Sequence, residues 1–302
     1  MRARKLHVFF LLFALSISFY GNQKETVKDA LGFAYGVESA PQRIVSLAPN
    51  ITEILFSLGL GEKVVGVTRF CDYPPQAQEK EKIGGLVDPN LERIKALNPD
   101  LVIGFRGNPL RILKRIRSLD LPLFVLEMGN DLESVFSVIE KIGKVTLSEK
   151  EAESLIQSLR NKYDAVQSAL RNVEHQPKVF LSIHGFSFWT SGKESFLNDL
   201  MTKAGGKNIA GNIPQKWLLY KQEQLIHQDP EIIVILCKSS QEFLKAKEWI
   251  RTKAYLQEVR AVETDRIYFL DENLAARPGP RLFKALEELA RLLHPKNFEI
   301  ER

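Results

Sequence analysis

Aromatic side chains recur in the short segments between the apolar runs of this 302-residue chain, together with a few polar residues that can make directional contacts. They follow stretches that read as buried strands, and ligands of open α/β sheets bind in the loops at the strand ends. Flat aromatic faces with few polar groups suit a large, flat, partly apolar ligand. We therefore expect these residues to line a ligand cleft: Pro49, Phe70, Tyr73, Phe105, Arg106, His184, Phe186, Trp217, Asn273 and Arg277.

Each assignment has a plainer alternative. Taken singly, Phe70 and Phe105 are also expected as core aromatics, because apolar side chains are mostly buried. His184 either ligates a metal ion carried by the ligand, or is an ordinary hydrogen-bonded polar residue. Trp217 is the strongest candidate for a ligand contact because the segment from Gly211 to Tyr220 is rich in Gly, Asn and Pro.

An enzyme is the second functional class to weigh. Ser182 or Ser187 together with His184 could serve a hydrolase, but the chain has no Gly-x-Ser-x-Gly elbow. It also has neither a Gly-x-Gly-x-x-Gly sequence nor a Walker sequence for phosphate binding. We expect no catalytic residues, no resident cofactor and no metal, with a secreted hydrolase as the remote alternative.

Two segments, residues 90–103 and 221–234, repeat each other. Each combines a short helix, a proline and an all-apolar strand, so the chain reads as two related lobes. Aligning the segments places Glu92 opposite Glu223. Either glutamate alone would be explained as a first-turn carboxylate that complements the helix dipole. Their equivalence in the two lobes favours a pair of docking contacts for a partner protein.

One long amphipathic helix is predicted between the lobes, over Leu147–Val173. Its apolar residues recur at spacings of three and four, with charged residues on the other faces. At 1.5 Å per residue such a helix reaches about 40 Å. A single packed helix resists hinge bending, so we expect little closure of the lobes on a ligand.

Outside this helix, short helices alternate with apolar strands. The alternation predicts an α/β protein of two Rossmann-like lobes with mainly parallel sheets, joined by the single long helix. A basic helix over Leu110–Ser118 is expected to face solvent. The expected organisation is a leader over 1–21, a flexible lead-in over 22–40, an N-terminal lobe over 41–146, the linking helix over 147–174 and a C-terminal lobe over 175–302.

The N-terminus has the pattern of a secretory signal peptide. Three basic residues precede an almost wholly apolar segment from His7 to Tyr20, which is too short to span a bilayer. An uncleaved membrane anchor is the alternative. No cysteine closely follows the apolar segment, so we expect export to a periplasm without lipid attachment. A net charge of +5 without a basic tract interleaved with aromatics gives no argument for nucleic-acid binding.

Two cysteines, Cys71 and Cys237, lie one in each half of the chain. An oxidising compartment permits a disulfide between them, but that bond would tie the lobes together across their gap. We expect two separate thiols. No Cys/His spacing suits zinc.

Four motifs carry a resemblance to a known family. They are Cys-Asp-Tyr-Pro-Pro-Gln-Ala-Gln at 71–78, Asn-Leu-Glu-Arg-Ile at 90–94, Asn-Pro-Asp-Leu-Val-Ile at 98–103 and Thr-Ser-Gly-Lys-Glu-Ser at 190–195. In this order they resemble the vitamin B12 periplasmic binding proteins of ABC importers, over a span from about Pro41 to Leu293. The wider group includes iron-siderophore and haem receptors, in which a single rigid helix joins two α/β lobes.

The resemblance implies a function and a ligand. It implies a monomer that captures cobalamin, or another corrinoid, between its lobes and delivers it to an ABC importer. Haem or an iron-siderophore is the alternative ligand. Phe70 stands where the B12 group has a tyrosine, and Phe105 where it has a tryptophan, whereas Trp217 matches a tryptophan. Leu86 replaces another pocket tryptophan.

Further positions carry over from the same resemblance. Asn273 stands at an acidic ligand-contacting position of the last loop, and Arg277 at the matching arginine. Glu92 and Glu223 match two exposed glutamates that pair with arginines on the permease dimer. Ala204 stands where one member of the family's cysteine pair is expected.

Overall fold

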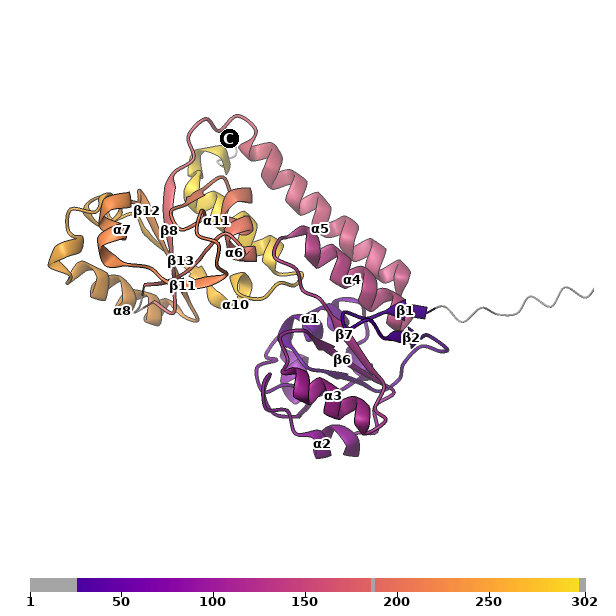
Figure 1. The fold of residues 1–302 in the computed structure, drawn as a ribbon. Coiled ribbons are helices and arrows are strands. Elements are labelled where there is room, and N and C mark those ends of the chain that lie inside the picture. The colour runs from indigo at the N-terminus through magenta and orange to yellow at the C-terminus, as the bar shows by residue number, and fades with distance from the viewer. Residues whose placement is uncertain (1–25, 186–187, 299–302) are drawn as a thin grey trace, which may run out of the picture.

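Two α/β lobes joined by a long helix make up the computed structural model, which describes residues 26–185 and 188–298 (Figure 1). The N-terminal lobe has a five-stranded parallel sheet with strand order β5-β4-β3-β6-β7, and the C-terminal lobe a four-stranded parallel sheet with order β10-β8-β12-β13. The predicted fold class is confirmed. The sheet strands are β3 Ile44–Ser46, β4 Val64–Val67, β5 Glu81–Lys82, β6 Leu101–Phe105, β7 Leu123–Leu126, β8 Lys178–Ile183, β10 Lys207–Asn208, β12 Ile232–Cys237 and β13 Ile267–Asp271.

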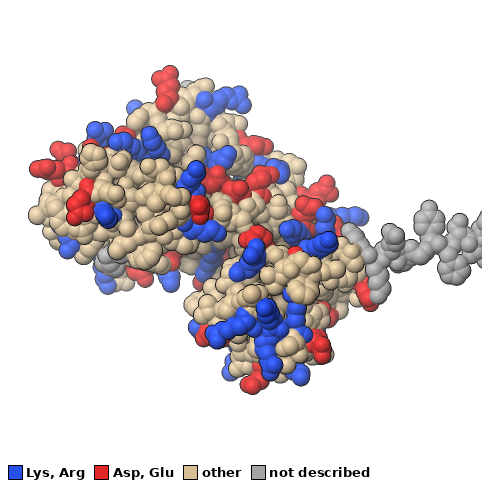
Figure 2. All heavy atoms as spheres, in the orientation of Figure 1, with Lys and Arg blue, Asp and Glu red and all other residues tan. Residues whose placement is uncertain are grey.

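Helices connect the parallel strands in both lobes, and short 3-10 turns lie in several of the loops. The basic helix is found at its predicted bounds, and Lys and Arg side chains gather over it on the surface of the N-terminal lobe (Figure 2). The helices are α1 Pro49–Ser57, α2 Leu91–Ala96, α3 Leu110–Ser118, α4 Glu133–Thr146, α5 Glu149–Leu170, α6 Phe196–Lys203, α7 Gln222–Gln228, α8 Ser240–Arg251, α9 Arg260–Glu263, α10 Glu272–Ala275 and α11 Leu282–Leu293.

The inner strands β6 and β12 are apolar because both of their faces are covered. In β6, Leu101 and Ile103 belong to the core cluster that includes α1 and α4, whereas Val102 belongs to the cluster that includes α2 and α3. Strand β12 alternates in the same way between two clusters. Parallel strands buried on both faces have no position for a solvent-facing polar residue, which is why the strands show no polar alternation.

The repeat seen in the sequence is a structural repeat. Asp100, after α2, accepts hydrogen bonds from the backbone N–H groups of Gln42 and Arg43, which directly precede β3. Glu231, at the matching place after α7, accepts one from the N–H of Lys178 at the start of β8. Burial alone would raise the pKa of Glu231, but this bond and one from His175 hold the pKa below its usual range. In each lobe, a carboxylate at the same place in the repeat thus holds the start of an inner strand, β3 in one lobe and β8 in the other.

The linking helix α5 is shorter than the predicted helix over 147–173. It spans 22 residues, or about 33 Å. Leu147 has left-handed backbone angles and ends α4 instead, so the chain turns sharply before α5 begins after Ser148. Leucine rarely adopts this conformation, so the sequence carries no visible signal for the break. At the other end, the helix stops at Leu170 although apolar spacing continues to Val173.

One hydrophobic core runs through both lobes by way of α5. Helix α5 packs on α4 and on α11, and its buried residues Ala152, Leu159 and Val166 belong to a cluster that extends into both sheets. Next to it, Phe136 of α4 stacks on Phe283 of α11, with ring centroids 5.0 Å apart. The lobes are therefore joined by packed side chains as well as by one helix.

Part of the segment predicted as a flexible lead-in folds as a hairpin. Strands β1 Thr26–Lys28 and β2 Ala34–Gly36 pair antiparallel. Between them, the buried carboxylate of Asp29 pairs with Arg117 of α3 and caps the turn through the N–H groups of Leu31 and Phe33. The hairpin depends on this partner 88 residues away, which local sequence could not reveal.

Two predicted loops of the C-terminal lobe contain a two-stranded antiparallel ribbon. It pairs β9 Trp189–Ser191 with β11 Trp217–Leu219. Each strand has three residues, too short to show an alternating pattern. The predicted leader lies outside the described residues, and within those residues no helix is long and apolar enough to cross a membrane.

Candidate functional site

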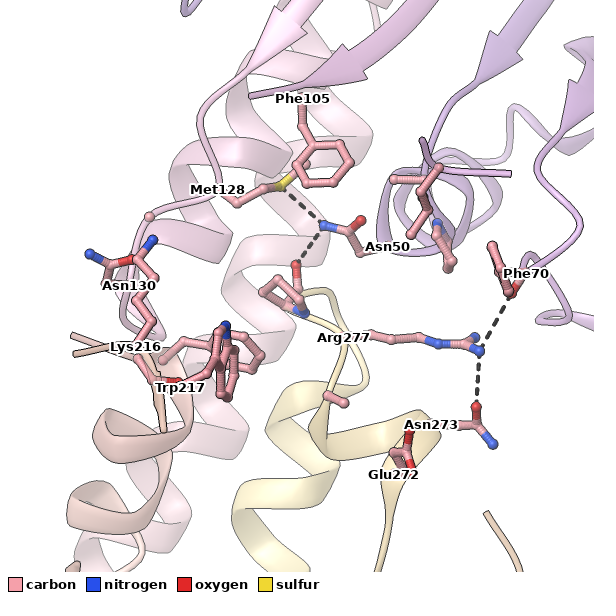
Figure 3. Close-up of a pocket in the computed structure, with 18 of the residues that line it drawn as sticks. Asn50, Phe70, Phe105, Met128, Asn130, Lys216, Trp217, Glu272, Asn273 and Arg277 are labelled. Atoms are coloured by element: carbon pink, nitrogen blue, oxygen red, sulfur yellow. Dashed lines mark hydrogen bonds between the residues drawn. The ribbon is translucent and has the colours of Figure 1, made fainter. Parts of the chain in front are cut away.

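A cavity of about 560 Å³ lies between the lobes, at the carboxyl ends of both parallel sheets. Ligand pockets commonly have volumes of this order. Figure 3 shows side chains from both lobes facing it. Its lining residues are Ala48, Pro49, Asn50, Arg69, Phe70, Asp72, Leu86, Phe105, Met128, Gly129, Asn130, Ser195, Phe196, Lys216, Trp217, Lys238, Glu272, Asn273, Ala276, Arg277 and Pro278.

The wall formed by the N-terminal lobe carries three of the predicted apolar contacts, Phe70, Leu86 and Phe105. Phe70 is 45% exposed, so it is no core residue. Asn108 fixes the other two positions, because its side chain accepts a bond from the N–H of Phe105 and donates one to the carbonyl of Leu86. One buried amide therefore positions two neighbouring segments of this wall.

The wall formed by the C-terminal lobe is built around Trp217, the first residue of β11. Its indole is 44% exposed and makes an edge-on contact with the ring of Phe196, with centroids 6.0 Å apart. Phe196 opens α6, and the hydroxyl of Ser195 caps that helix. Trp217 is thus held by the ribbon and by the start of α6, with its free face toward the cavity (Figure 3).

Arg277 lines the cavity but is engaged by groups of the protein. Its guanidinium donates two hydrogen bonds to Asp72, at 2.5 and 3.0 Å, and others to Glu53 and Asn273. The hydrogen bond from Arg277 lowers the pKa of Asp72, so this carboxylate is ionised at neutral pH. Arg277 belongs to the C-terminal lobe and Asp72 to the N-terminal lobe, so the pair joins the two walls.

Glu53 and Arg281 complete an interlobe charge cluster, which we define as Glu53, Asp72, Arg277 and Arg281. Glu53, on α1, is 2% exposed and accepts bonds of 2.9 and 2.6 Å from Arg281. The guanidinium of Arg281 also stacks over the ring of Tyr73, 3.9 Å from its centroid. Tyr73 therefore packs beside the interlobe charge cluster, and it is absent from the lining of the cavity.

The remaining predicted contacts lie apart from the cavity or outside the described residues. Arg106 is exposed and pairs with Glu127 at 3.2 Å. The side chain of His184 is 68% exposed, and its Nδ1 lies 3.9 Å from an Oε1 of Glu272, which does line the cavity. Phe186 falls outside the described residues. The structure therefore brings seven predicted residues together: Pro49, Phe70, Leu86, Phe105, Trp217, Asn273 and Arg277.

Several lining residues were not predicted. Met128, Asn130 and Lys238 follow strands β7 and β12, so a stricter use of the strand-end rule would have included them. Lys216 directly precedes Trp217. Asp72, in contrast, meets an arginine 205 residues away, and no local signal marks that pairing.

The two glutamates predicted for docking occupy equivalent exposed positions. Glu92 is the second residue of α2, and Glu223 the second residue of α7. Neither carboxylate has an ion-pair partner among the residues that the structure describes. Helices α2 and α7 lie on different lobes (Figure 1), so the two carboxylates present two separated contact points.

Both cysteines are free, buried thiols in different core clusters. Burial raises the pKa of Cys237 to about 11, with a smaller contribution from the nearby carboxylates of Glu242 and Glu272. Burial also raises the pKa of Cys71. Across residues 26–185 and 188–298, no group of three His, Cys, Asp or Glu side chains could hold a metal ion.

Comparison with known proteins agrees with this architecture. The family model for "Periplasmic binding protein" matches residues 44–274. An uncharacterised ABC transporter substrate-binding lipoprotein of Bacillus subtilis is 29% identical over 280 residues, covering 91% of this chain and 87% of the relative. The vitamin B12-binding protein of Photorhabdus laumondii is 28% identical over 263 residues, covering 87% of this chain and 91% of the relative.

Solved structures give the same result. The periplasmic haem-binding protein RhuT of Roseiflexus sp. RS-1, in its apo form, superposes with a TM-score of 0.76 at 27% identity, covering 86% of this chain and 99% of that structure. These relatives are binding proteins, so the expectation that the chain is not an enzyme is confirmed. The two-lobed fold, the cavity between the lobes and the match over residues 44–274 show that the chain belongs to the periplasmic binding protein family of ABC transporters.

Proposed function

We propose that this protein captures cobalamin, or a related corrinoid, between its lobes and delivers it to an ABC importer. The observation that carries the proposal is the arrangement of flat aromatic side chains on both walls of one cavity. Phe70 and Phe105 face it from the N-terminal lobe, and Trp217 from the C-terminal lobe. Such walls suit a planar macrocycle, whose edges can extend into solvent between the lobes.

The donor set of the cleft favours a corrinoid over haem. Haem iron is usually held by an axial His, Cys, Met or Tyr of the protein. Among the described lining residues there is no His, Cys or Tyr, and the thioether of Met128 accepts a hydrogen bond from Asn50 at 3.1 Å. A cobalamin carries its own axial base, so it requires no metal ligand from the protein.

Haem remains the second candidate because of His184. Its exposed imidazole lies next to Glu272 at the edge of the cleft, and both His184 and Gly185 have left-handed backbone angles. A histidine held by such a turn could reach a ligand that extends beyond the cavity. The relative from Roseiflexus is a haem-binding protein, which keeps this alternative open.

Equilibrium dialysis against three coloured ligands tests the assignment. We expect cyanocobalamin to be retained at one equivalent, whereas haemin and the ferric siderophore ferrichrome equilibrate freely across the membrane. If haemin is retained and cyanocobalamin is not, the ligand is haem and the corrinoid assignment is wrong. In that case a Soret shift that disappears in His184→Ala would identify the axial ligand.

Delivery is proposed to occur at a permease dimer through Glu92 and Glu223. One exposed carboxylate at the same place on each lobe offers two contact points with approximate two-fold symmetry, as a dimeric partner requires. Charge pairs of this kind favour encounter and register more than affinity. We propose that the protein acts as a monomer, since one chain supplies both walls of the cleft.

The proposed location is a periplasm, with a soluble mature chain that carries no lipid. The basic and apolar leader supports export, and no cysteine precedes Cys71 that could accept a lipid. Osmotic shock should release the protein together with other periplasmic proteins. Recovery in the membrane fraction would instead support an uncleaved anchor.

A further inference from the structure

Two lysines of the cleft have no partner within the described part of the chain. Among its cationic lining residues, Arg69 pairs with Asp88 at 3.1 Å and Arg277 with Asp72. The side chains of Lys216 and Lys238 make no hydrogen bond or ion pair with any described residue, and both are exposed. Two lysines that line the cleft therefore lack an ion-pair partner among the described residues.

Both lysines belong to the C-terminal lobe and line the same cavity as Trp217. Lys216 directly precedes Trp217, and Figure 3 shows the two side by side with Asn130 close by. Lys238 directly follows β12, at the carboxyl edge of the sheet. The opposite wall presents Phe70, Leu86 and Phe105, so its contribution is mainly apolar.

The carboxylates of the cleft do not neutralise these lysines. Asp72 is engaged by Arg277, as described above. Glu272 lies 3.9 Å from the imidazole of His184 and forms no ion pair with either lysine. A ligand in the cavity therefore meets two lysine side chains without an ion-pair partner among the described residues, and an oxygen anion on the ligand can form charge-assisted hydrogen bonds with them. A bound ligand is therefore expected to supply an anion.

We infer that Lys216 and Lys238 form an anion subsite, which binds a phosphodiester or carboxylate on the periphery of the ligand and fixes the ligand's orientation against Trp217. This inference rests on the proposed role of the cleft as the ligand site. A phosphodiester is supplied by the nucleotide loop of a cobalamin, and carboxylates by the propionates of a haem. Both are singly charged oxygen acceptors that suit an ammonium donor.

Two matched ligand pairs test the subsite in the double variant Lys216→Gln/Lys238→Gln. Cyanocobalamin has the phosphodiester and dicyanocobinamide lacks it; haemin has free carboxylates and haemin dimethyl ester has none. We expect the double variant to bind the member with the peripheral anionic group, here called the anionic member, about tenfold more weakly in the pair that the protein accepts, given partly exposed charges. Its affinity for the member without this group should be unchanged. The double variant Lys216→Glu/Lys238→Glu should weaken anion binding further.

The control is Lys193→Gln, which removes an exposed lysine of the same lobe that does not line the cavity. It should leave all affinities unchanged. Equal losses for both members of a pair, or no loss for the anionic member, would overturn the anion subsite while leaving the corrinoid assignment intact. If only haemin and haemin dimethyl ester bind, the corrinoid assignment is wrong. The lysines are then tested by comparing the affinities of these two ligands in the double variant. If none of the four ligands binds, both proposals are wrong.

Discussion

Glu53 is the side chain of the interlobe charge cluster whose loss should cost most. It is almost fully buried and accepts bonds from Arg277 and Arg281. We expect Glu53→Gln to lower the free energy of unfolding by about 3–5 kcal/mol, because two largely buried arginines lose their shared counter-charge. Asp72→Asn should cost about 1 kcal/mol or less, since half of the Asp72 side chain is exposed. Urea unfolding at pH 7 measures both.

The contribution of Asp72 should depend on pH. Its pKa is lowered in the folded protein by the hydrogen bond from Arg277, so its stabilising contribution is full above the pKa of the unfolded chain. It is lost as the pH falls through the lower, folded pKa. The difference between the wild type and Asp72→Asn should therefore begin to shrink as the pH falls below about 4, and it should disappear only below the folded pKa. A difference that stays constant as the pH falls below about 4, or a cost equal to that of Glu53→Gln, would contradict this assignment of Asp72.

The cysteines should be unreactive in the folded protein. With a pKa of about 11, Cys237 is about 0.1% thiolate at pH 8, and Cys71 is buried as well. We expect Ellman's reagent at pH 8 to modify neither thiol in the native protein, and to modify both in guanidinium chloride. Rapid labelling of either native thiol would show that its burial is wrong.

At the residue scale, the sequence predicts the lining of the cavity best where a side chain lies at the end of an apolar strand or in a turn-rich segment. Phe105 is the last residue of β6, and Trp217 lies in a segment rich in turn residues. Tyr73 was predicted by the same reasoning, but its ring packs under Arg281. That contact joins residues 208 apart in the sequence, and local patterns do not encode such a pairing.

At the scale of elements, α5 should make the two lobes unfold together. Its buried face belongs to a core that extends into both sheets. We expect Leu159→Ala to lower the free energy of unfolding by about 2–5 kcal/mol while the calorimetric transition remains single. Ser158→Ala, on the exposed face of the same helix, should change it by no more than about 0.5 kcal/mol. Two separate transitions would show that the lobes are independent.

The elements themselves were largely predictable from periodicity. Helix α3 has its predicted bounds, and the two repeated segments contain the predicted helix and strand, because each combines a clear apolar pattern with flanking turn residues. The ends of α5 and the ribbon of β9 and β11 were missed. The first depends on a left-handed leucine, and the second on pairing between two three-residue segments.

At the scale of the whole molecule, the two exposed glutamates should matter for transport alone. We expect Glu92→Arg/Glu223→Arg to abolish uptake of the ligand in cells, because charge reversal would repel the arginines that the docking proposal expects on the permease. Ligand binding by the purified variant should be unchanged, since neither residue lines the cavity. Radiolabelled uptake and equilibrium dialysis measure the two properties separately.

The matched control for docking is Glu62→Arg/Glu263→Arg, which reverses one exposed glutamate on each lobe at other positions. Uptake should survive in this control. Uptake that survives equally in Glu92→Arg/Glu223→Arg would show that the permease docks elsewhere.

The linking helix is one of several connections between the lobes. The pattern predicts a single stiff connection, whereas the lobes are also joined by the stacking of Phe136 on Phe283 and by the interlobe charge cluster. These contacts flank the cavity and α5, so they oppose both opening and twisting of the lobes. The two aromatic walls therefore keep a fixed separation before a ligand binds, and this preorganisation lowers the conformational cost of binding.

Calorimetric titration of cyanocobalamin into the wild type and Trp217→Ala tests the central claim most directly. We expect one site per chain, and an affinity lowered about tenfold or more in Trp217→Ala, because a macrocycle loses its aromatic contact on one wall. Trp189→Ala, which removes an equally exposed tryptophan away from the cavity, should bind as the wild type does. No heat with cyanocobalamin, or equal affinities for the wild type and Trp217→Ala, would contradict the account.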